Sequence, residues 1–180
     1  MKMLIMNPIE LKGNIKGLLS YFFISTDYQR NKHHDVYGDG IICDKDDVLI
    51  YDFESKGKRN VVENEFIIRS KYHNKTKYLS GNDYNSLLVY IVLEESEYNL
   101  SQDELDKRFN DLFKKIYVEY MNFCKSYNQV GVICPHLEQN GNEGFDSPHL
   151  HFLYTNKNIG ENQLFNYFYT TLSDDITDDV

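Results

Sequence analysis

The sequence predicts an α+β domain with a mainly antiparallel sheet and helices packed on one face of that sheet. Two observations lead to this prediction: short apolar runs typical of strands recur along the chain, and longer segments with helical periodicity stand between them. No internal repeat or linker divides the sequence. The chain has 180 residues, so a single domain spanning 1–180 can bury about 70% of the surface of its unfolded form.

In the first part of the chain, residues 9–23 place most of their apolar side chains on one face, which predicts a helix. Residues 41–43 and 48–53 are apolar runs separated by a polar turn, and this pattern predicts a β-hairpin. Residues 66–72 fit either a strand or a helix.

The second part of the chain carries the clearest signals. Residues 87–93 are almost continuously apolar, as in a central strand that is buried on both faces. Ser101 and Glu104 form a capping box, which predicts the start of a long helix. Residues 130–134 are expected to form a strand, and residues 162–172 a last helix. The long helix is expected to face the core with Leu105, Phe109, Leu112, Ile116, Tyr120 and Phe123.

The chain is acidic, with a formal net charge of −9 at pH 7, and residues 174–180 are expected to form a solvated acidic tail. A protein that binds duplex DNA by neutralising its phosphates usually carries the opposite charge. Contact with nucleic acid therefore requires a local basic patch or a metal ion. Residues 55–60 are expected to form a basic loop. The longer stretch 56–78 is also basic and contains tyrosines. It is either a solvated surface or a nucleic-acid-binding patch that uses Lys56, Lys58, Arg59 and Lys71.

The cysteines and the hydropathy of the chain indicate its compartment. Cys43, Cys124 and Cys134 are far apart and show no CxxC spacing, as expected for free thiols in a reducing cytosol. No apolar run reaches the roughly 18 residues of a membrane-spanning helix, and the apolar stretch within residues 1–8 is too short for a signal peptide. The sequence therefore predicts a cytoplasmic protein without a membrane partner.

Two histidines define the candidate site. His149 and His151 lie two residues apart in an apolar stretch, 147–154, that reads as a buried strand. Side chains alternate between the two faces of a strand, so both imidazoles are expected on one face. His136 follows the apolar run 130–134, and if the two runs pair as antiparallel strands, three imidazoles can converge.

Three histidines in this arrangement favour a metal site over purely structural roles. Neutral imidazole suits transition metals, and three protein ligands leave a coordination position open for a substrate oxygen. Glu138 and Asp146 are the nearby carboxylates that could complete the ligand set or orient an imidazole. Cleavage of a phosphodiester is a natural use of such a site, because the metal polarises a phosphoryl oxygen.

The motif of His136-Leu-Glu138, a loop, and Pro148-His149-Leu-His151 resembles the metal site of HUH endonucleases, and most closely that of MobV- and MobP-type mobilisation relaxases. The likeness covers residues 87–158 best. It implies a ferredoxin-like palm that binds Mg²⁺ or Mn²⁺, or another divalent transition metal, through His136, His149 and His151. It also implies Glu138 as a member of the catalytic set.

The resemblance further implies a nucleophile near the N-terminus that attacks the phosphate of a single strand. Tyr21 occupies the position of the tyrosine in MobP-like enzymes, and Tyr28, His33 and His34 are alternatives. Arg30 and Lys32 are expected to neutralise phosphate charge.

Two features differ from the relaxase pattern: the chain is acidic, and the connection between His136 and Pro148 is longer than in the family. They suit a mobile-element or phage protein that acts on single-stranded RNA or DNA. With RNA, the 2′-hydroxyl could replace a protein nucleophile. One such protein would be an anti-CRISPR nuclease that trims a guide RNA, with a CRISPR effector ribonucleoprotein as partner. The alternatives are a plasmid mobilisation nickase and a non-catalytic acidic protein that mimics nucleic acid in a basic groove.

Overall fold

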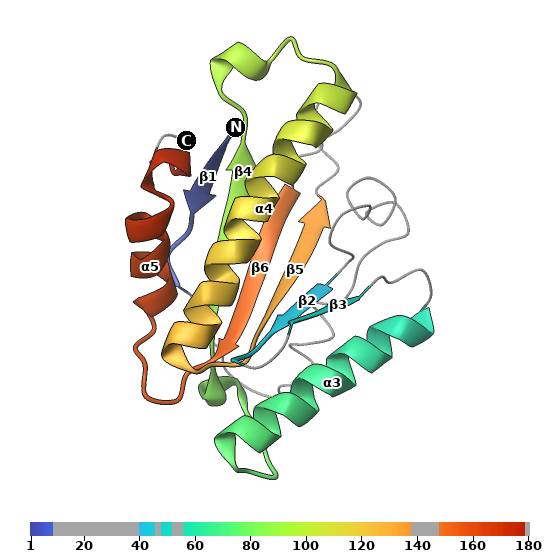
Figure 1. Ribbon diagram of the computed structural model, residues 1–180, viewed down its shortest axis with the longest axis vertical. Helices are drawn as coiled ribbons and strands as arrows, with labels where there is room; N and C mark the ends of the chain where they lie inside the picture. Colours follow the sequence, from blue (N-terminus) through green and yellow to red (C-terminus); the bar gives the residue numbers. More distant parts are fainter. Residues whose placement is uncertain (9–39, 46–47, 52–55, 138–147, 179–180) are drawn as a thin grey trace.

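A six-stranded antiparallel sheet forms the centre of the computed structural model, which describes residues 1–8, 40–45, 48–51, 56–137 and 148–178 (Figure 1). The strands lie in the order β1-β4-β6-β5-β2-β3, and every neighbouring pair is antiparallel. Together with the helices, this sheet confirms the predicted α+β class. The elements are β1 (Lys2–Ile5), β2 (Gly40–Cys43), β3 (Val48–Tyr51), α3 (Lys56–Asn74), β4 (Tyr84–Val92), α4 (Gln102–Tyr127), β5 (Gly131–Leu137), β6 (Pro148–Thr155) and α5 (Gln163–Thr171).

The central strands form because apolar residues recur at every second position in β4 and β6. Their alternate side chains therefore build one continuous apolar face. The buried members on this face are Leu87, Val89, Ile91, Leu150, Phe152 and Tyr154. The strands predicted at 87–93 and 130–134 are confirmed as β4 and β5, and the predicted hairpin is confirmed as β2 and β3.

Helix α4 covers this apolar face, with α5 beside it (Figure 1). As predicted, the Ser101 hydroxyl accepts a hydrogen bond from the Glu104 amide, and the Glu104 carboxylate accepts one from the Ser101 amide. The helix ends at Asn128, whose φ of 51° is left-handed. All six residues expected to face the core are buried. Each such side chain contributes about 1.5–3 kcal/mol on burial.

Helix α3 corrects two predictions. It begins at Lys56, so the loop expected at 55–60 is wrong for residues 56–60. Lysine and arginine are good helix formers. Further along the helix, Phe66 is buried and anchors it to the sheet. The Phe66 ring lies 5.5 Å from the ring of Tyr84, which pairs with Thr155 and so lies on the sheet face opposite Tyr154. The helices therefore do not all pack on one face: α4 and α5 cover one, and α3 contacts the other.

Within the segment that was expected to be a solvated acidic tail, Asp174 and Asp178 are exposed, but residues 175–177 contact the rest of the protein. Ile176 makes a β-bridge with Met3 of β1, and the Thr177 amide donates to the Met3 carbonyl at 2.9 Å. Lys115 on α4 approaches Asp175 at 3.2 Å. Strand β1 itself was not predicted, and the helix expected at 9–23 lies outside the described residues. In the described part of the chain, no helix combines the length and apolar character needed to cross a membrane.

Candidate functional site

The pairing of β5 with β6 places three histidine positions on one face of the sheet. His136 and His149 are direct partners in the register, and His151 is two residues further along β6. Directly opposed residues of an antiparallel pair lie on the same face, with Cβ atoms about 4.5–5.5 Å apart. The convergence expected from the sequence is therefore present in the backbone.

The imidazoles of His149 and His151 lie close together. Their ring centroids are 5.0 Å apart, with an angle of 80° between the planes, and each residue is 8% exposed. Both project from the sheet face that α4 does not cover, because Leu150 and Phe152 of the same strand point toward α4 and α5. Two imidazoles are thus held on a rigid strand, close enough to act at one point.

The next strand on the other side of β6 brings Tyr90 beside this pair. Tyr90 is the register partner of His149 from β4, it is half-buried, and its ring centroid lies 5.7 Å from that of His149. No local signal in the sequence assigns Tyr90 to the site. The alternation in residues 84–92 shows which residues share a face, but the pairing of β4 with β6 cannot be derived from it.

Cys134 was also missed, and it lies opposite His151 in the register. Its side chain is 2% exposed, and burial raises the pKa of the thiol far above its ordinary value. Since only the thiolate is a good metal ligand, Cys134 lies beside the histidines as a neutral, packed residue.

The residues present fit a divalent metal in their chemistry. Two imidazoles and a third histidine position share one face, and imidazole nitrogen is a common ligand of first-row metals. Among the side chains that the structure describes, no three His, Cys, Asp or Glu residues lie close enough to hold a metal ion. The side chain of His136 lies outside the described part of the structure. The described side chains therefore include two of the three expected ligands, His149 and His151.

The other expected site residues fall into two groups. The first lies outside the described residues: Tyr21, Tyr28, Arg30, Lys32, His33, His34, Glu138 and Asp146. The second group belongs to α3, with Lys56, Lys58 and Arg59 in its first turn and Lys71 in its last. The structure therefore spreads the expected nucleic-acid-binding lysines along one helix.

Comparison of the chain with protein-family models, with curated proteins and with solved structures gives no match.

Proposed function

We propose that this protein is a metal-dependent nuclease that cleaves phosphodiester bonds of single-stranded nucleic acid. The observation that supports this most is the position of His136 opposite His149, with His151 on the same face. The antiparallel sheet, with β4, β6 and β5 adjacent and helices packed against it, is compatible with a ferredoxin-like palm of the HUH type.

His136, His149 and His151 would hold Mg²⁺ or Mn²⁺. When bound, the ion would polarise a phosphoryl oxygen and stabilise the charge that develops on it. The strand backbone fixes the direction of the His149 and His151 imidazoles, and the apolar face on the other side of the sheet is buried, so these two ligands would need little reorganisation. Glu138 is the carboxylate that would complete the set.

Three sources of the nucleophile are open to test. Tyr90 lies beside His149, with the two ring centroids 5.7 Å apart. Tyr21 corresponds to the nucleophile of MobP-like relaxases. On RNA, the adjacent 2′-hydroxyl could attack the phosphorus, with departure of the 5′-oxygen. In biological terms, we propose a cytoplasmic mobile-element or phage protein, such as an anti-CRISPR nuclease acting on guide RNA.

A non-catalytic role is the second candidate. The net charge of −9 suits a protein that occupies a basic nucleic-acid groove, and the 8% exposure of both His149 and His151 suits histidines with a structural role. In that case the same three histidines would pack or hold a structural ion, and no strand would be cut.

The two candidates differ in a simple cleavage experiment. Labelled single-stranded RNA and DNA are incubated with the protein and Mn²⁺ or Mg²⁺, with and without EDTA. We expect cleavage that EDTA stops and that is lost in His149→Ala/His151→Ala. Cys134→Ala is the matched control, because it truncates a buried residue on the same face and should keep activity. Cleavage that persists in EDTA, or in a folded double variant, would contradict the proposal.

The same assay separates the nucleophiles. Tyr90→Phe should abolish cleavage and prevent a covalent adduct on DNA if Tyr90 attacks the phosphate. Cleavage of RNA that survives in Tyr90→Phe and Tyr21→Phe, but fails on a strand with a 2′-deoxy group at the cut site, would assign the attack to the 2′-hydroxyl.

A further inference from the structure

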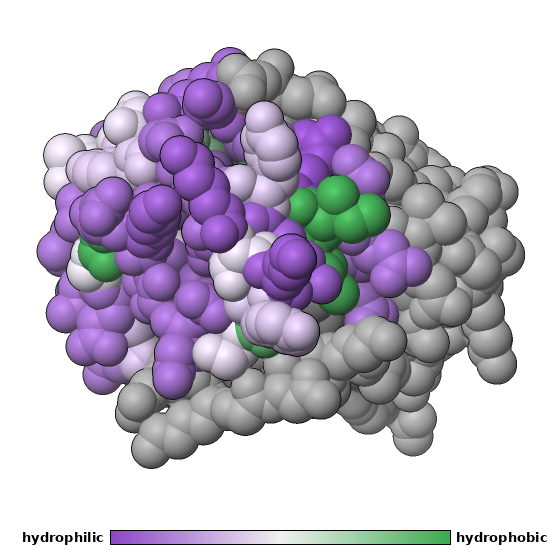
Figure 2. Space-filling model, turned by 90° about the horizontal axis from the view of Figure 1, so that it is seen from below, coloured by the Kyte–Doolittle hydropathy of each residue, from purple (hydrophilic) through white to green (hydrophobic). Residues whose placement is uncertain are grey.

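A cavity of 620 Å³ lies at the end of the sheet where β5 begins and β6 ends. The residues that line it come from the last turns of α3, the end of α4 and the loops after β2 and β6. Seen from below, the described surface at this end is mostly hydrophilic and carries a small hydrophobic patch (Figure 2). Val130 lines the cavity and His136 lies six residues further along the chain, so the cavity is about 20 Å from the candidate metal centre.

The charge of the cavity is opposite to that of the whole chain. Its lining contains four permanently cationic side chains, Lys45, Arg69, Lys75 and Lys157, and one carboxylate, that of Asp44. Asp44 accepts a hydrogen bond from Arg69 at 2.6 Å and so neutralises one of the four. None of the ion pairs between described residues involves the remaining three lysines. Three ammonium groups around one cavity in a chain of net charge −9 indicate an anionic ligand.

The inner wall of the cavity is held by Gln129, which is 2% exposed. Its side-chain nitrogen donates to the carbonyls of Tyr127 at 3.1 Å and Lys157 at 2.6 Å, and its oxygen accepts from Thr155 at 2.6 Å. These bonds tie the loop that carries Lys157 to the end of α4. The cavity is therefore a built feature and not a gap between loose segments.

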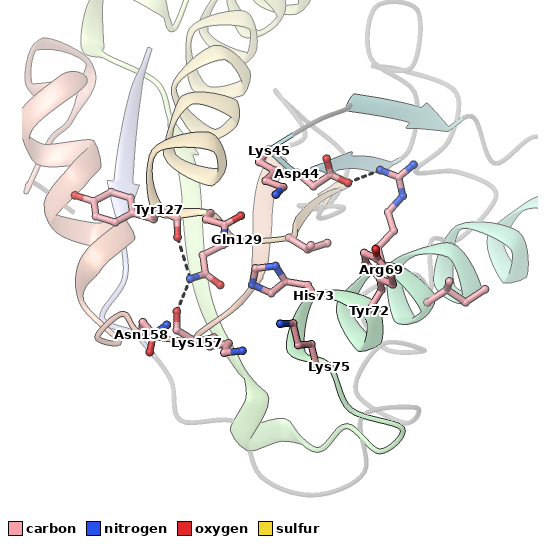
Figure 3. Close-up of a pocket in the computed structure, with 13 residues that line it drawn as sticks. Asp44, Lys45, Arg69, Tyr72, His73, Lys75, Tyr127, Gln129, Lys157 and Asn158 are labelled. Carbon is pink, nitrogen blue, oxygen red and sulfur yellow. Dashed lines mark hydrogen bonds and ion pairs between the residues drawn. The ribbon is translucent and has the colours of Figure 1, made fainter.

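The imidazole of His73 lies at the centre of this arrangement, between Gln129 and the side chains of Lys45 and Lys75 (Figure 3). Its Nε2 atom is buried and makes no hydrogen bond within the described part of the chain, although the ring interacts with the side chain of Gln129. An anion bound among the lysines would supply an acceptor for this nitrogen.

The mouth of the cavity is aromatic and apolar. Tyr72 is 88% exposed and Ile68 is 61% exposed, and their spacing of four residues places them on one side of α3. An exposed tyrosine offers a ring on which a nucleobase can stack. The lining thus combines exposed lysine side chains with an exposed aromatic ring and an apolar side chain.

We propose that this cavity binds a phosphate-bearing nucleotide, with the phosphate among Lys45, Lys75 and Lys157 and the base against Tyr72 and Ile68. Its volume lies within the range of about 300–1,000 Å³ that is usual for small-ligand sites. The nucleotide is either free in solution or one unit of a nucleic-acid strand. The proposal does not depend on the metal centre, because none of its residues belongs to it.

Calorimetry in EDTA, without divalent metal, tests the proposal separately from nuclease activity. The probes are AMP, adenosine, inorganic phosphate and a short single-stranded RNA. We expect AMP or the RNA to bind, and Lys45→Gln/Lys75→Gln/Lys157→Gln to weaken that binding by about tenfold or more. The matched control is Lys107→Gln/Lys114→Gln/Lys115→Gln, which removes the same charge from the exposed side of α4 and should change little. Tyr72→Ala should weaken binding of the nucleotide by about tenfold but leave that of inorganic phosphate unchanged, because it removes only the stacking surface.

The source of the nucleotide follows from the same titrations. Tight binding of AMP with weak binding of the RNA assigns a free nucleotide, and the reverse assigns a strand. Three results would overturn the proposal. The first is that neither AMP nor the RNA binds, and the second is that adenosine binds as tightly as AMP. The third is that the two triple-lysine variants bind AMP or the RNA with equal affinity. A polyglutamate peptide that binds as tightly as the RNA would also overturn it, since simple charge attraction would then be sufficient.

Discussion

His136 and His149 occupy directly opposed positions of β5 and β6, on the sheet face that α4 and α5 leave uncovered. This relationship turns two separate sequence motifs into one candidate site. It depends on backbone pairing alone, so the apolar residues that fix the register of β5 and β6 also fix the distance between the two histidine positions. A shift of the register by one residue would move His149 and His151 to the core face.

Binding of Mn²⁺ should raise the melting temperature of the wild-type protein. A ligand at one hundred times its dissociation constant stabilises the folded state by about 2.7 kcal/mol, which corresponds to roughly 5–11 °C for a chain of this size. The rise should be absent in His149→Ala/His151→Ala and reduced in His136→Ala, and it should persist in Cys134→Ala. Differential scanning fluorimetry with and without EDTA measures it. An equal rise in all four proteins would place the metal elsewhere.

Gly131→Ala should destabilise the fold. A Cβ atom at Gly131 would overlap the Tyr120 hydroxyl and lie 2.7 Å from the ring carbon Cζ. Tyr120 cannot move away easily, because it is fully buried and donates to the Leu153 carbonyl at 2.9 Å. Overpacking of this kind costs about 1–3 kcal/mol in the free energy of unfolding, measurable by urea denaturation.

A double variant checks the cause of that loss. Tyr120→Phe removes the overlapping oxygen, so Gly131→Ala should cost less in the Tyr120→Phe background than in the wild type. Equal costs in both backgrounds would show that Tyr120 is not the obstacle.

The start of α4 and the central strands could be predicted from the sequence because their signals are local. The Ser101–Glu104 capping box fixes the first turn of the helix, and alternation in 148–155 fixes which histidines share a face. Strand β1 and the beginning of α3 have weaker local signals. In the structure, β1 and α3 make contacts with distant parts of the chain, those of Met3 with Thr177 and of Phe66 with Tyr84.

The neighbours of the histidines could not be predicted, because they come from pairing between distant parts of the chain. Tyr90 is beside His149 only through the register of β4 with β6, and Cys134 is opposite His151 only through that of β5 with β6. The basic cavity is a stronger case. Lys45, His73 and Lys157 are far apart in sequence and meet only after the sheet and α3 have assembled.

Ser101→Ala should lower the free energy of unfolding by about 1 kcal/mol, because the Ser101 hydroxyl accepts the Glu104 amide at the start of α4. The control is Ser126→Ala, which makes the same change at an exposed position near the end of this helix. It should leave stability unchanged or slightly raise it, since alanine has the higher helix propensity. Chemical denaturation of both variants separates the loss of the cap from the change in helix propensity. An equal decrease in the free energy of unfolding of the two variants would rule out capping as the reason.

His73 should make the protein less stable as the pH falls from 7.5 to 5.5. Burial lowers the pKa of His73 below 6.5, and the ammonium groups of Lys157 and Lys45 lower it further, while Gln129 and Asp44 act in the opposite direction. Below pH 6.5 the unfolded chain therefore takes up a proton at His73 that the folded protein does not, so the free energy of unfolding decreases with falling pH.

The comparison with His73→Asn isolates this contribution from the other titrating groups. Urea denaturation of both proteins at pH 7.5, 6.5 and 5.5 gives the difference in their free energies of unfolding. Any advantage of the wild type should be largest at pH 7.5 and should shrink as the pH falls, since only the wild type carries the penalty for protonation. A bound phosphate should weaken the trend, because it compensates the positive charge of Lys45, Lys75 and Lys157 around a protonated ring. A difference that is independent of pH, or that grows toward pH 5.5, would show that burial among these lysines does not control the protonation of His73.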